Sequence, residues 1–340
     1  MRDPSAAPVA PSEDAVVSSR RAIEAHSKSF ALASRLLPPV VREDAWVVYA
    51  WCRRVDDAID ECPAGERAEA LDRLRAELNE AYGDTPSADP VLAGFQAVVR
   101  RRNIPRAYPE DLLAGMAMDV AGARYERLSD LRTYCYRVAG TVGLMMCHIM
   151  GVRRDEALVR AAHLGMAMQM TNLCRDVAED WEQGRLYLPA DWLTEEGAGW
   201  LTSVRPGDAL PARARRPVAR VVARVLDEAD ALYRSGDRGL SDLSWRCALA
   251  VRTARAVYSD IGKVLRARGC DVTGGRATVP RWRKLARALQ SLARAAMECP
   301  ARVYLHLTGH PRPRPPTRTL HAPPTVNFGD AFTFKFRDTP

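Results

Sequence analysis

Residues 169–191 of the chain, QMTNLCRDVAEDWEQGRLYLPAD, place three oxygen-bearing side chains four residues apart within an apolar stretch. On an α-helix, Asn172, Asp176 and Asp180 share one face with Gln169, within an arc of about 80°. Carboxylate and amide oxygens are the hard ligands that Mg²⁺ prefers. The stretch therefore predicts a helix that carries a row of magnesium ligands, and the rest of the fold must enclose that row.

A second helix with an acidic face is predicted over residues 42–61, REDAWVVYAWCRRVDDAIDE. Its apolar residues cover most of the circumference, which is typical of a buried helix. Four polar side chains share one face within about 60°: Tyr49, Arg53, Asp56 and Asp60. Carboxylates four residues apart often form a solvated surface, but unpaired carboxylates in a buried helix cost several kcal/mol each. Because Arg53 alone cannot neutralise them and the neighbouring Asp57, a bound metal ion is the simplest explanation.

The remaining pattern predicts an all-α protein with one main domain. The chain has 340 residues, 47% of them hydrophobic, and no linker divides its middle. Residues 1–15 are expected to be a disordered lead, residues 16–300 the helical domain, and residues 301–340 a Pro-rich, disordered tail. Within that tail, only AFTFKF alternates like a strand.

The net charge of +8 indicates an anionic partner, such as nucleic acid, a membrane surface or a phosphorylated small molecule. The cations are scattered among acids, which favours a solvated surface over a nucleic-acid groove. Residues 281–298 form a basic amphipathic helix, interpreted as a surface helix packed on the core, with an anionic membrane as the alternative. The start lacks an apolar signal region and no run is long enough to span a membrane, so we expect a cytoplasmic protein without an integral anchor. Eight isolated cysteines indicate reduced thiols rather than a disulfide or zinc framework.

Three further features have both a structural and a functional interpretation. The polar insert His26–Ser29 is either a solvated turn or helix face, or a clamp for phosphate oxygens. Gly140 and Gly143 indicate either close helix–helix contact or a thin wall beside a bulky apolar ligand. Arg185, which follows the second acidic helix, suits a ligand phosphate as well as the end of that helix.

If the two acidic helices face each other, five oxygen-bearing side chains line one cavity, enough for two or three Mg²⁺ ions. Such ions normally join protein carboxylates to substrate phosphates, and the apolar surroundings then predict a diphosphate on a long hydrocarbon body. Cations would stabilise the departing diphosphate, while a dry wall with tyrosine rings would protect the carbocation left behind.

Four sequence blocks together resemble the squalene/phytoene synthase family: HSKSFALASRLLP, YAWCRRVDDAID, YCYRVAGTVGLMM and QMTNLCRDVAEDWEQGRLYLPADWL. The resemblance extends in order over roughly residues 20–290, and in detail the blocks resemble those of bacterial members that make 15-cis-phytoene. It implies an all-α isoprenoid-synthase bundle with a central cavity. It also implies a prenyl transferase that joins two geranylgeranyl diphosphates head to head, through a cyclopropylcarbinyl diphosphate, in the first committed step of carotenoid biosynthesis.

The resemblance also implies a role for each matching residue. The implied magnesium ligands, for which Mn²⁺ is a candidate substitute, are Asp56, Asp60, Asn172, Asp176 and Asp180. The implied substrate-binding residues are His26, Ser27, Lys28, Ser29, Tyr49, Arg53, Gln169, Asn172, Arg175, Tyr258 and Arg276. The implied catalytic residues are Tyr49, Arg53, Asp56, Asp60, Tyr134, Asp176 and Asp180.

Several alternatives stay open at this level. Within the family, a C30 enzyme would use farnesyl diphosphate to make squalene or dehydrosqualene, and squalene would also require a nicotinamide cofactor, which we do not expect here. A helical binding or assembly protein of the same fold would dispense with the acidic residues, and a nucleic-acid binder would leave the buried carboxylates unexplained. Expected partners are the prenyl diphosphate, with a peripheral membrane contact and other carotenoid-pathway enzymes as candidates.

Overall fold

The protein is a bundle of α-helices with one small β-hairpin, seen in a computed structural model that describes residues 10–152, 154–204, 209–307, 318–321 and 335–338. The first helices are α1 (Glu13–His26), α2 (Lys28–Ser34), α3 (Pro39–Asp60), α4 (Arg67–Ala81), α5 (Pro90–Arg102) and α6 (Ala107–Val120). The following helices are α7 (Leu128–Cys135), α8 (Thr141–Met150), α9 (Asp155–Glu182), α10 (Ala190–Glu195), α11 (Arg215–Asp237), α12 (Trp245–Ala267) and α13 (Arg281–Leu307). Short 3₁₀ turns lie at Ala64–Glu66, Gly199–Ser203, Ala212–Ala214 and Arg238–Asp242, and a π turn lies at Tyr136–Gly140.

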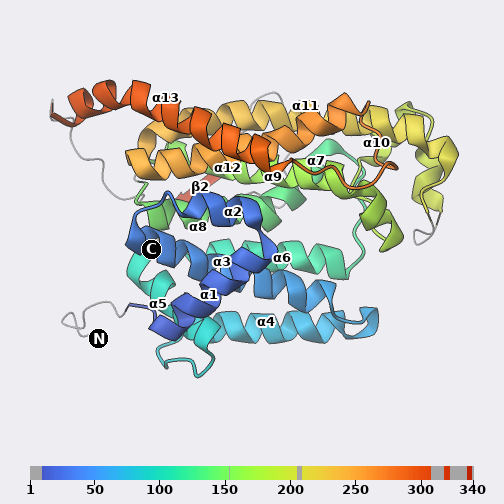
Figure 1. Ribbon diagram of the computed structural model, residues 1–340. Helices are drawn as coiled ribbons and strands as arrows, with labels where there is room; N and C mark the ends of the chain where they lie inside the picture. The colour runs from blue at the N-terminus through green and yellow to red at the C-terminus, as the bar shows by residue number, and fades with distance from the viewer. Residues whose placement is uncertain (1–9, 153, 205–208, 308–317, 322–334, 339–340) are drawn as a thin grey trace.

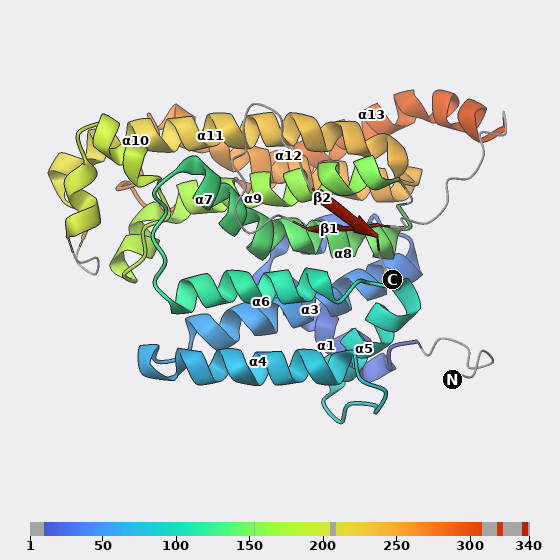
Figure 2. The same cartoon turned by 180° about the vertical axis from the view of Figure 1, so that it is seen from behind.

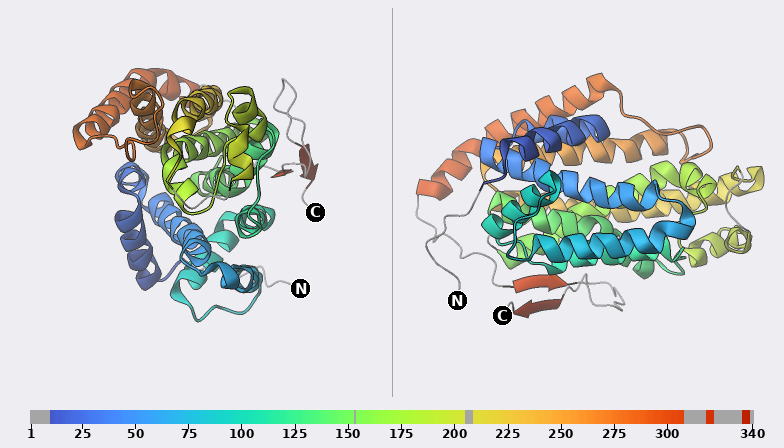
Figure 3. Two further views of the ribbon diagram at one scale, coloured as in Figure 1. Left: turned by 90° about the vertical axis from the view of Figure 1, so that its right-hand side faces the viewer. Right: turned by 90° about the horizontal axis from the view of Figure 1, so that it is seen from below.

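The bundle has two halves, which Figures 1 and 2 show from opposite sides. Helices α3 to α6 form the lower half, and α7, α9, α11 and α12 form the upper half, with α8 between them. Helices α1 and α2 cross the front, and α13 runs along the outside of α12. The two strands, β1 (Arg318–His321) and β2 (Lys335–Asp338), pair antiparallel and lie apart from α13 (Figure 3). The all-α prediction is confirmed for the bundle, and the hairpin is a small addition to it.

The two acidic helices belong to opposite halves of the bundle. The apolar residues of α3, such as Trp51 and Val55, are fully buried and join one large core with Met170 and Trp181 of α9. Helix α3 packs against α1, α4, α5 and α8, whereas α9 packs against α8, α11 and α12. The prediction that α3 is a buried helix is therefore confirmed.

Two helical stretches of the sequence are interrupted in the structure. The segment from Arg20 to Pro38 divides at Ser27, whose extended backbone ends α1 and whose hydroxyl accepts a hydrogen bond from the Phe30 amide at the start of α2. The segment from residue 129 to residue 151 changes pitch at the π turn. A π turn is an insertion within a helix that is common at functional sites.

Close contact with α9 explains the glycines of α8 and the π turn. A Cβ atom added to Gly143 would lie 2.6 Å from the carbonyl oxygen of Ala161. The reciprocal contact is tighter, because a Cβ atom on Gly165 of α9 would lie 2.3 Å from the carbonyl oxygen of Ala139. Of the two interpretations, the structure favours close helix–helix packing.

The boundaries of the proposed lead and tail stay predictions. Helix α1 begins at Glu13, with Ser12 as its N-cap, and residues 1–9 lie outside the described part of the chain. Helix α13 continues to Leu307, and most of the Pro-rich segment, including residues 331–334 of the predicted strand, lies outside the described residues. No helix in the described part of the chain is long and apolar enough to cross a membrane. The cysteines that the structure describes are free thiols, as the sequence indicates.

Candidate active site

The acidic face of α3 combines one paired and one unpaired carboxylate. Asp60, at the last turn, forms an ion pair of 2.8 Å with Arg185. Asp56 lies one turn earlier, and its pKa is raised to about 7. Burial is the main cause, the nearby charge of Asp60 adds to it, and Arg53 opposes both effects. Arg53 itself pairs with Asp57, the carboxylate at the edge of this face, rather than with Asp56. Asp56 is therefore an acceptor that still needs a cation.

The acidic face of α9 repeats this arrangement. Asp176 accepts hydrogen bonds from Arg175 at 2.7 Å and lies 3.0 Å from Arg276, which belongs to the loop before α13. Asp180, one turn later, has no ion pair with a described residue in the structure, and burial together with the charge of Asp176 raises its pKa to about 7. The second motif thus also ends with one carboxylate paired and one available.

The turn after α9 brings the two faces together. Gly184 has a φ of +86°, a conformation that glycine adopts without strain, and it reverses the chain so that the Arg185 amide donates to the Asp180 carbonyl at 2.8 Å. The Arg185 side chain then reaches Asp60 on α3 and lowers the pKa of Asp180 on α9. Two motifs separated by more than 100 residues therefore share one cation.

Asp119 is a third acidic element that the sequence patterns missed. It lies near the end of α6 and accepts hydrogen bonds from the hydroxyls of Tyr134 at 2.9 Å and Tyr187 at 2.7 Å. Burial raises the pKa of Asp119, and its charge in turn raises the pKa of both Asp56 and Asp180. The sequence could have indicated Asp119, because it stands within the apolar run GMAMDVAG and an aspartate is rarely buried without a partner.

The predicted clamp at His26–Ser29 is the break between α1 and α2. Ser27 and Ser29 are half-buried there, whereas His26 and Lys28 are exposed. Ser27 forms a hydrogen bond with Tyr258 that lowers the phenol's pKa, although burial raises it more. Ser29 accepts a hydrogen bond of 3.2 Å from Lys284 of α13. The structure therefore brings the two serines to the α12–α13 side of the site.

Phe30 connects this clamp to the acidic faces. Its ring stacks on Tyr258 at 4.9 Å and meets the edge of Tyr49 of α3 at 6.3 Å. Burial raises the pKa of Tyr49 to about 12, and Arg53 opposes that shift. Arg175, which pairs with Asp176, lowers the pKa of Tyr258. Tyr49, Arg175 and Tyr258 thus lie in one electrostatic neighbourhood, and their roles in substrate binding stay predictions.

The donors suit a hydrated Mg²⁺ ion better than an enclosed metal. No three Asp, Glu, His or Cys side chains in the described part of the chain converge closely enough to enclose an ion alone. The Oδ1 atom of Asn172 is buried and has no hydrogen-bond partner among the described residues. It shares its helix face with half-buried Gln169 and with Asp176. Since Mg²⁺ keeps several waters and commonly uses one or two carboxylates plus substrate phosphates, this donor set fits it.

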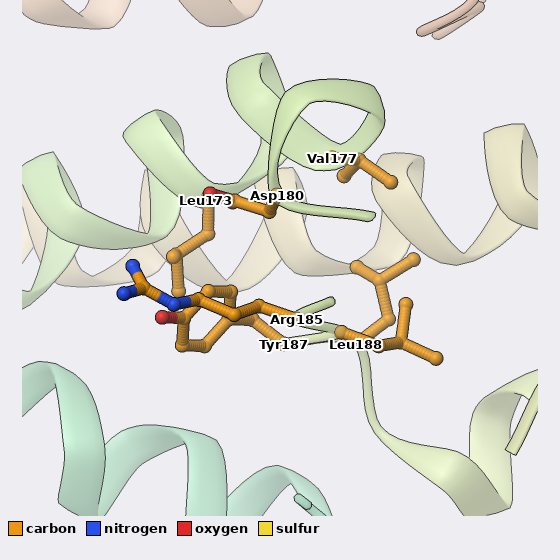
Figure 4. Close-up of a pocket in the computed structure, with 7 residues that line it drawn as sticks. Leu173, Val177, Asp180, Arg185, Tyr187 and Leu188 are labelled. Atoms are coloured by element: carbon orange, nitrogen blue, oxygen red, sulfur yellow. The ribbon is translucent and has the colours of Figure 1, made fainter. Parts of the chain in front are cut away.

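A small hollow adjoins the acidic residues (Figure 4). Apolar side chains of α9 and the following segment form much of its wall. Its lining residues are Leu173, Val177, Asp180, Arg185, Leu186, Tyr187 and Leu188. Charged and apolar side chains therefore line the same hollow, beside the acidic face of α9.

Comparison with known proteins identifies the family. Residues 23–283 match squalene/phytoene synthase, over more than half of the chain. The chain belongs to the squalene/phytoene synthase family. Its similar relatives include a 15-cis-phytoene synthase of Paracoccus sp. (strain N81106 / MBIC 01143), 44% identical over 75% of this chain and 84% of that protein. A phytoene synthase of Rhodobacter capsulatus is 39% identical over 89% of this chain and 87% of that protein.

Solved structures of squalene/phytoene synthases share the bundle. A dehydrosqualene synthase crystallised with a ligand superposes with a TM-score of 0.75 at 27% identity, covering 84% of this chain and 98% of that one. A squalene synthase from Alicyclobacillus acidocaldarius gives a TM-score of 0.67 at 28% identity, covering 76% of this chain and 95% of that one. The predicted family and isoprenoid-synthase fold are both confirmed.

Proposed function

We propose that the protein is a 15-cis-phytoene synthase, a transferase of prenyl groups that condenses two geranylgeranyl diphosphates head to head. One observation carries this proposal: the acidic faces of α3 and α9 meet at Arg185, where each presents a carboxylate with a raised pKa. Relatives named phytoene synthase, at 38–44% identity, support the C40 product.

In this reaction each half-step releases one diphosphate and one proton, first forming the cyclopropylcarbinyl diphosphate and then phytoene. Arg53, Arg175 and Arg276, with the serines of the α1–α2 break, would bind diphosphate oxygens as charge-assisted donors. Tyr134 would line the reaction centre, and its hydrogen bond to Asp119 fixes the direction of its hydroxyl. The apolar wall would exclude water from the carbocation.

We assign the metal to Mg²⁺, with Mn²⁺ as a substitute. Asp56 and Asp60 of α3, with Asn172, Asp176 and Asp180 of α9, would hold it, because these are the oxygen donors on the two facing surfaces. When bound, the ion would stabilise negative charge on the departing diphosphate. The fit to Asp56 and Asp180 is electrostatic, since a cation would satisfy the two carboxylates that have no arginine of their own.

The second candidate is a C30 enzyme that makes dehydrosqualene from farnesyl diphosphate. It is favoured by the superposition on a dehydrosqualene synthase at a TM-score of 0.75. Sequence identity favours the C40 enzymes, at 44% against 27%. A non-catalytic role is disfavoured because all five proposed metal ligands are present. The proposed reaction uses no nicotinamide cofactor, and the proposal includes no nucleic-acid partner. The proposed location is the cytoplasm, with other carotenoid-pathway enzymes as candidate partners.

The deciding experiment supplies purified protein with Mg²⁺ and either geranylgeranyl or farnesyl diphosphate, and identifies the hydrocarbons by mass. We expect 15-cis-phytoene from the C20 substrate and little product from the C15 substrate. A C30 product with no C40 product would replace the proposal by its alternative. Mn²⁺ binding, measured by electron paramagnetic resonance in the presence of inorganic diphosphate, tests the metal site independently of turnover.

A further inference from the structure

Helix α13 exposes an apolar face to the outside of the bundle. Between residues 282 and 297, where the structure describes the side chains of α13, the large apolar ones are between 50% and 74% exposed, whereas the core of this protein buries such residues almost completely. We define the outer face by these residues: Trp282, Leu285, Leu289, Leu292 and Met297. Their spacing of three, four, three and five residues follows one side of a helix. Figure 1 shows α13 along the edge of the molecule, beyond α12. The outer face therefore has no partner within the described part of the chain.

The opposite side of α13 holds the helix to the bundle through polar contacts. Arg287 donates two hydrogen bonds, of 2.7 Å and 2.8 Å, to buried Asp260 of α12. Lys284 donates to Ser29 of α2, and Ser291 is 3% exposed. On a helix these three residues point about 150° away from the outer face. A surface helix normally turns its apolar side towards the core. In α13 the polar side faces the bundle and the apolar side faces outward.

The charge of α13 indicates what the outer face contacts. The helix contains six Lys or Arg residues and a single Glu. Arg283 lies beside the outer face, with its guanidinium 5.9 Å from the centre of the Trp282 ring, and exposed Arg294 lies between that face and the side that carries Arg287. A second copy docked face to face would bring these positive charges together, whereas an anionic surface would be attracted to them. Apolar side chains flanked by cations and a tryptophan are typical of helices that lie in a membrane interface.

We propose that the outer face of α13 lies on an anionic lipid surface and attaches the protein to the membrane as a peripheral protein. The helix also connects that surface to the candidate site, because Lys284 contacts the serine clamp and the preceding loop supplies Arg276 to Asp176. This inference deepens the proposed function, since a hydrocarbon product requires an apolar acceptor. Its structural support does not depend on the product's length.

The test measures co-sedimentation of the full-length protein with vesicles, in the absence of substrate. Vesicles of phosphatidylcholine alone are compared with vesicles that contain phosphatidylglycerol. We expect binding to the anionic vesicles that weakens as NaCl is raised, and much weaker binding to the neutral ones. Vesicle binding and turnover are measured separately. A protein that binds vesicles but makes no product would contradict only the proposed function, and a protein that makes product but does not bind vesicles would contradict only the membrane contact.

Two double variants and two matched controls locate the contact. Leu285→Asn with Leu289→Asn removes apolar area and should weaken vesicle binding more than tenfold. Arg283→Gln with Arg294→Gln should weaken binding to anionic vesicles by about fivefold for each arginine and reduce the salt dependence. Val17→Asn on α1 and Arg73→Gln on α4 change exposed residues away from α13 and should leave binding unchanged. Circular dichroism and thermal unfolding check that the variants fold, which the exposure of these side chains predicts.

Two outcomes would overturn the proposal. Equal vesicle binding by the wild-type protein and the leucine double variant would remove the outer face from the contact. Absence of vesicle binding, together with a dimer in sedimentation velocity that the leucine variant converts to a monomer, would assign the face to a second copy of the chain.

Discussion

The acidic faces of α3 and α9 use one arrangement twice. In each, one carboxylate is paired with arginine and the other, one turn away, has a pKa raised to about 7 by burial and by its neighbour. The pairs are Asp60 with Asp56 and Asp176 with Asp180. The free carboxylate precedes the paired one in α3 and follows it in α9. Because both acidic helices carry such a carboxylate on the shared side, the free carboxylates are not packing defects.

The two faces differ in where their arginines come from. Asp176 receives Arg175 from its own helix and Arg276 from the loop before α13. Asp60 instead receives Arg185, which follows the other acidic helix and also lowers the pKa of Asp180. The arginine at Asp60 therefore joins the two halves of the bundle. The arginines at Asp176 lie instead on the side of the site that faces the His26–Ser29 clamp. Substitutions can test whether this difference matters for function.

The largest expected effect comes from removing one carboxylate of each face. Asp56→Asn and Asp176→Asn should each reduce turnover by roughly 10²- to 10³-fold, since each removes a charge that would hold the metal at the departing diphosphate. Steady-state assays with geranylgeranyl diphosphate measure the loss, and Mn²⁺ binding measures the site itself. Asp72→Asn, on the exposed surface of α4, is the control. Activity near the wild-type level in either variant, with the fold intact, would contradict the assignment of that face.

The two arginine contacts should differ in strength. Arg185→Gln is expected to lower kcat/KM by roughly tenfold to a hundredfold, because Arg185 is the cation that both acidic faces share: it pairs with Asp60 and lowers the pKa of Asp180. Arg276→Gln should cost only a few-fold, since Asp176 keeps its second arginine, Arg175. The same assay compares both variants. An equal loss would mean that Arg276 contributes as much to the site as the arginine that joins the two acidic faces.

Helical spacing explains why both faces could be predicted from the sequence. Residues three or four apart share a side of a helix, and the apolar flanks of α3 and α9 require burial, so the acidic sets follow from local pattern alone. The pair of Asp60 with Arg185 could not be predicted, because it depends on how two distant helices pack. Asp119 has no second polar residue at helical spacing, and only its tyrosine partners from α7 and the segment after α9 reveal its place. The break at Ser27 was foreseen as a polar insert but not as the end of a helix.

Asp119 tests whether the two faces are coupled through a third carboxylate. Its charge raises the pKa of Asp56 on one face and of Asp180 on the other. Asp119→Asn should therefore lower both pKa values, and it should reduce turnover by roughly tenfold because the hydroxyl of Tyr134 loses a charged partner. The pH profile of kcat/KM then shifts towards lower pH, an effect that a purely structural role would not produce. An unchanged profile would show that Asp119 only positions the tyrosines.

The last comparison concerns stability, and it compares the two free carboxylates directly. The pKa values of Asp56 and Asp180 in the folded protein are about 7, above the value of about 3.9 for an unfolded aspartate, so the folded state binds more protons between these limits. The free energy of unfolding should therefore fall as pH rises from about 4 to 7 and change little above that window. Urea unfolding in EDTA at pH 5 and pH 8 measures the fall. Asp56→Asn and Asp180→Asn should each reduce it by similar amounts, because an amide does not titrate. A reduction in only one variant would show that one face is solvated, and that the resemblance between the two helices is confined to their sequences.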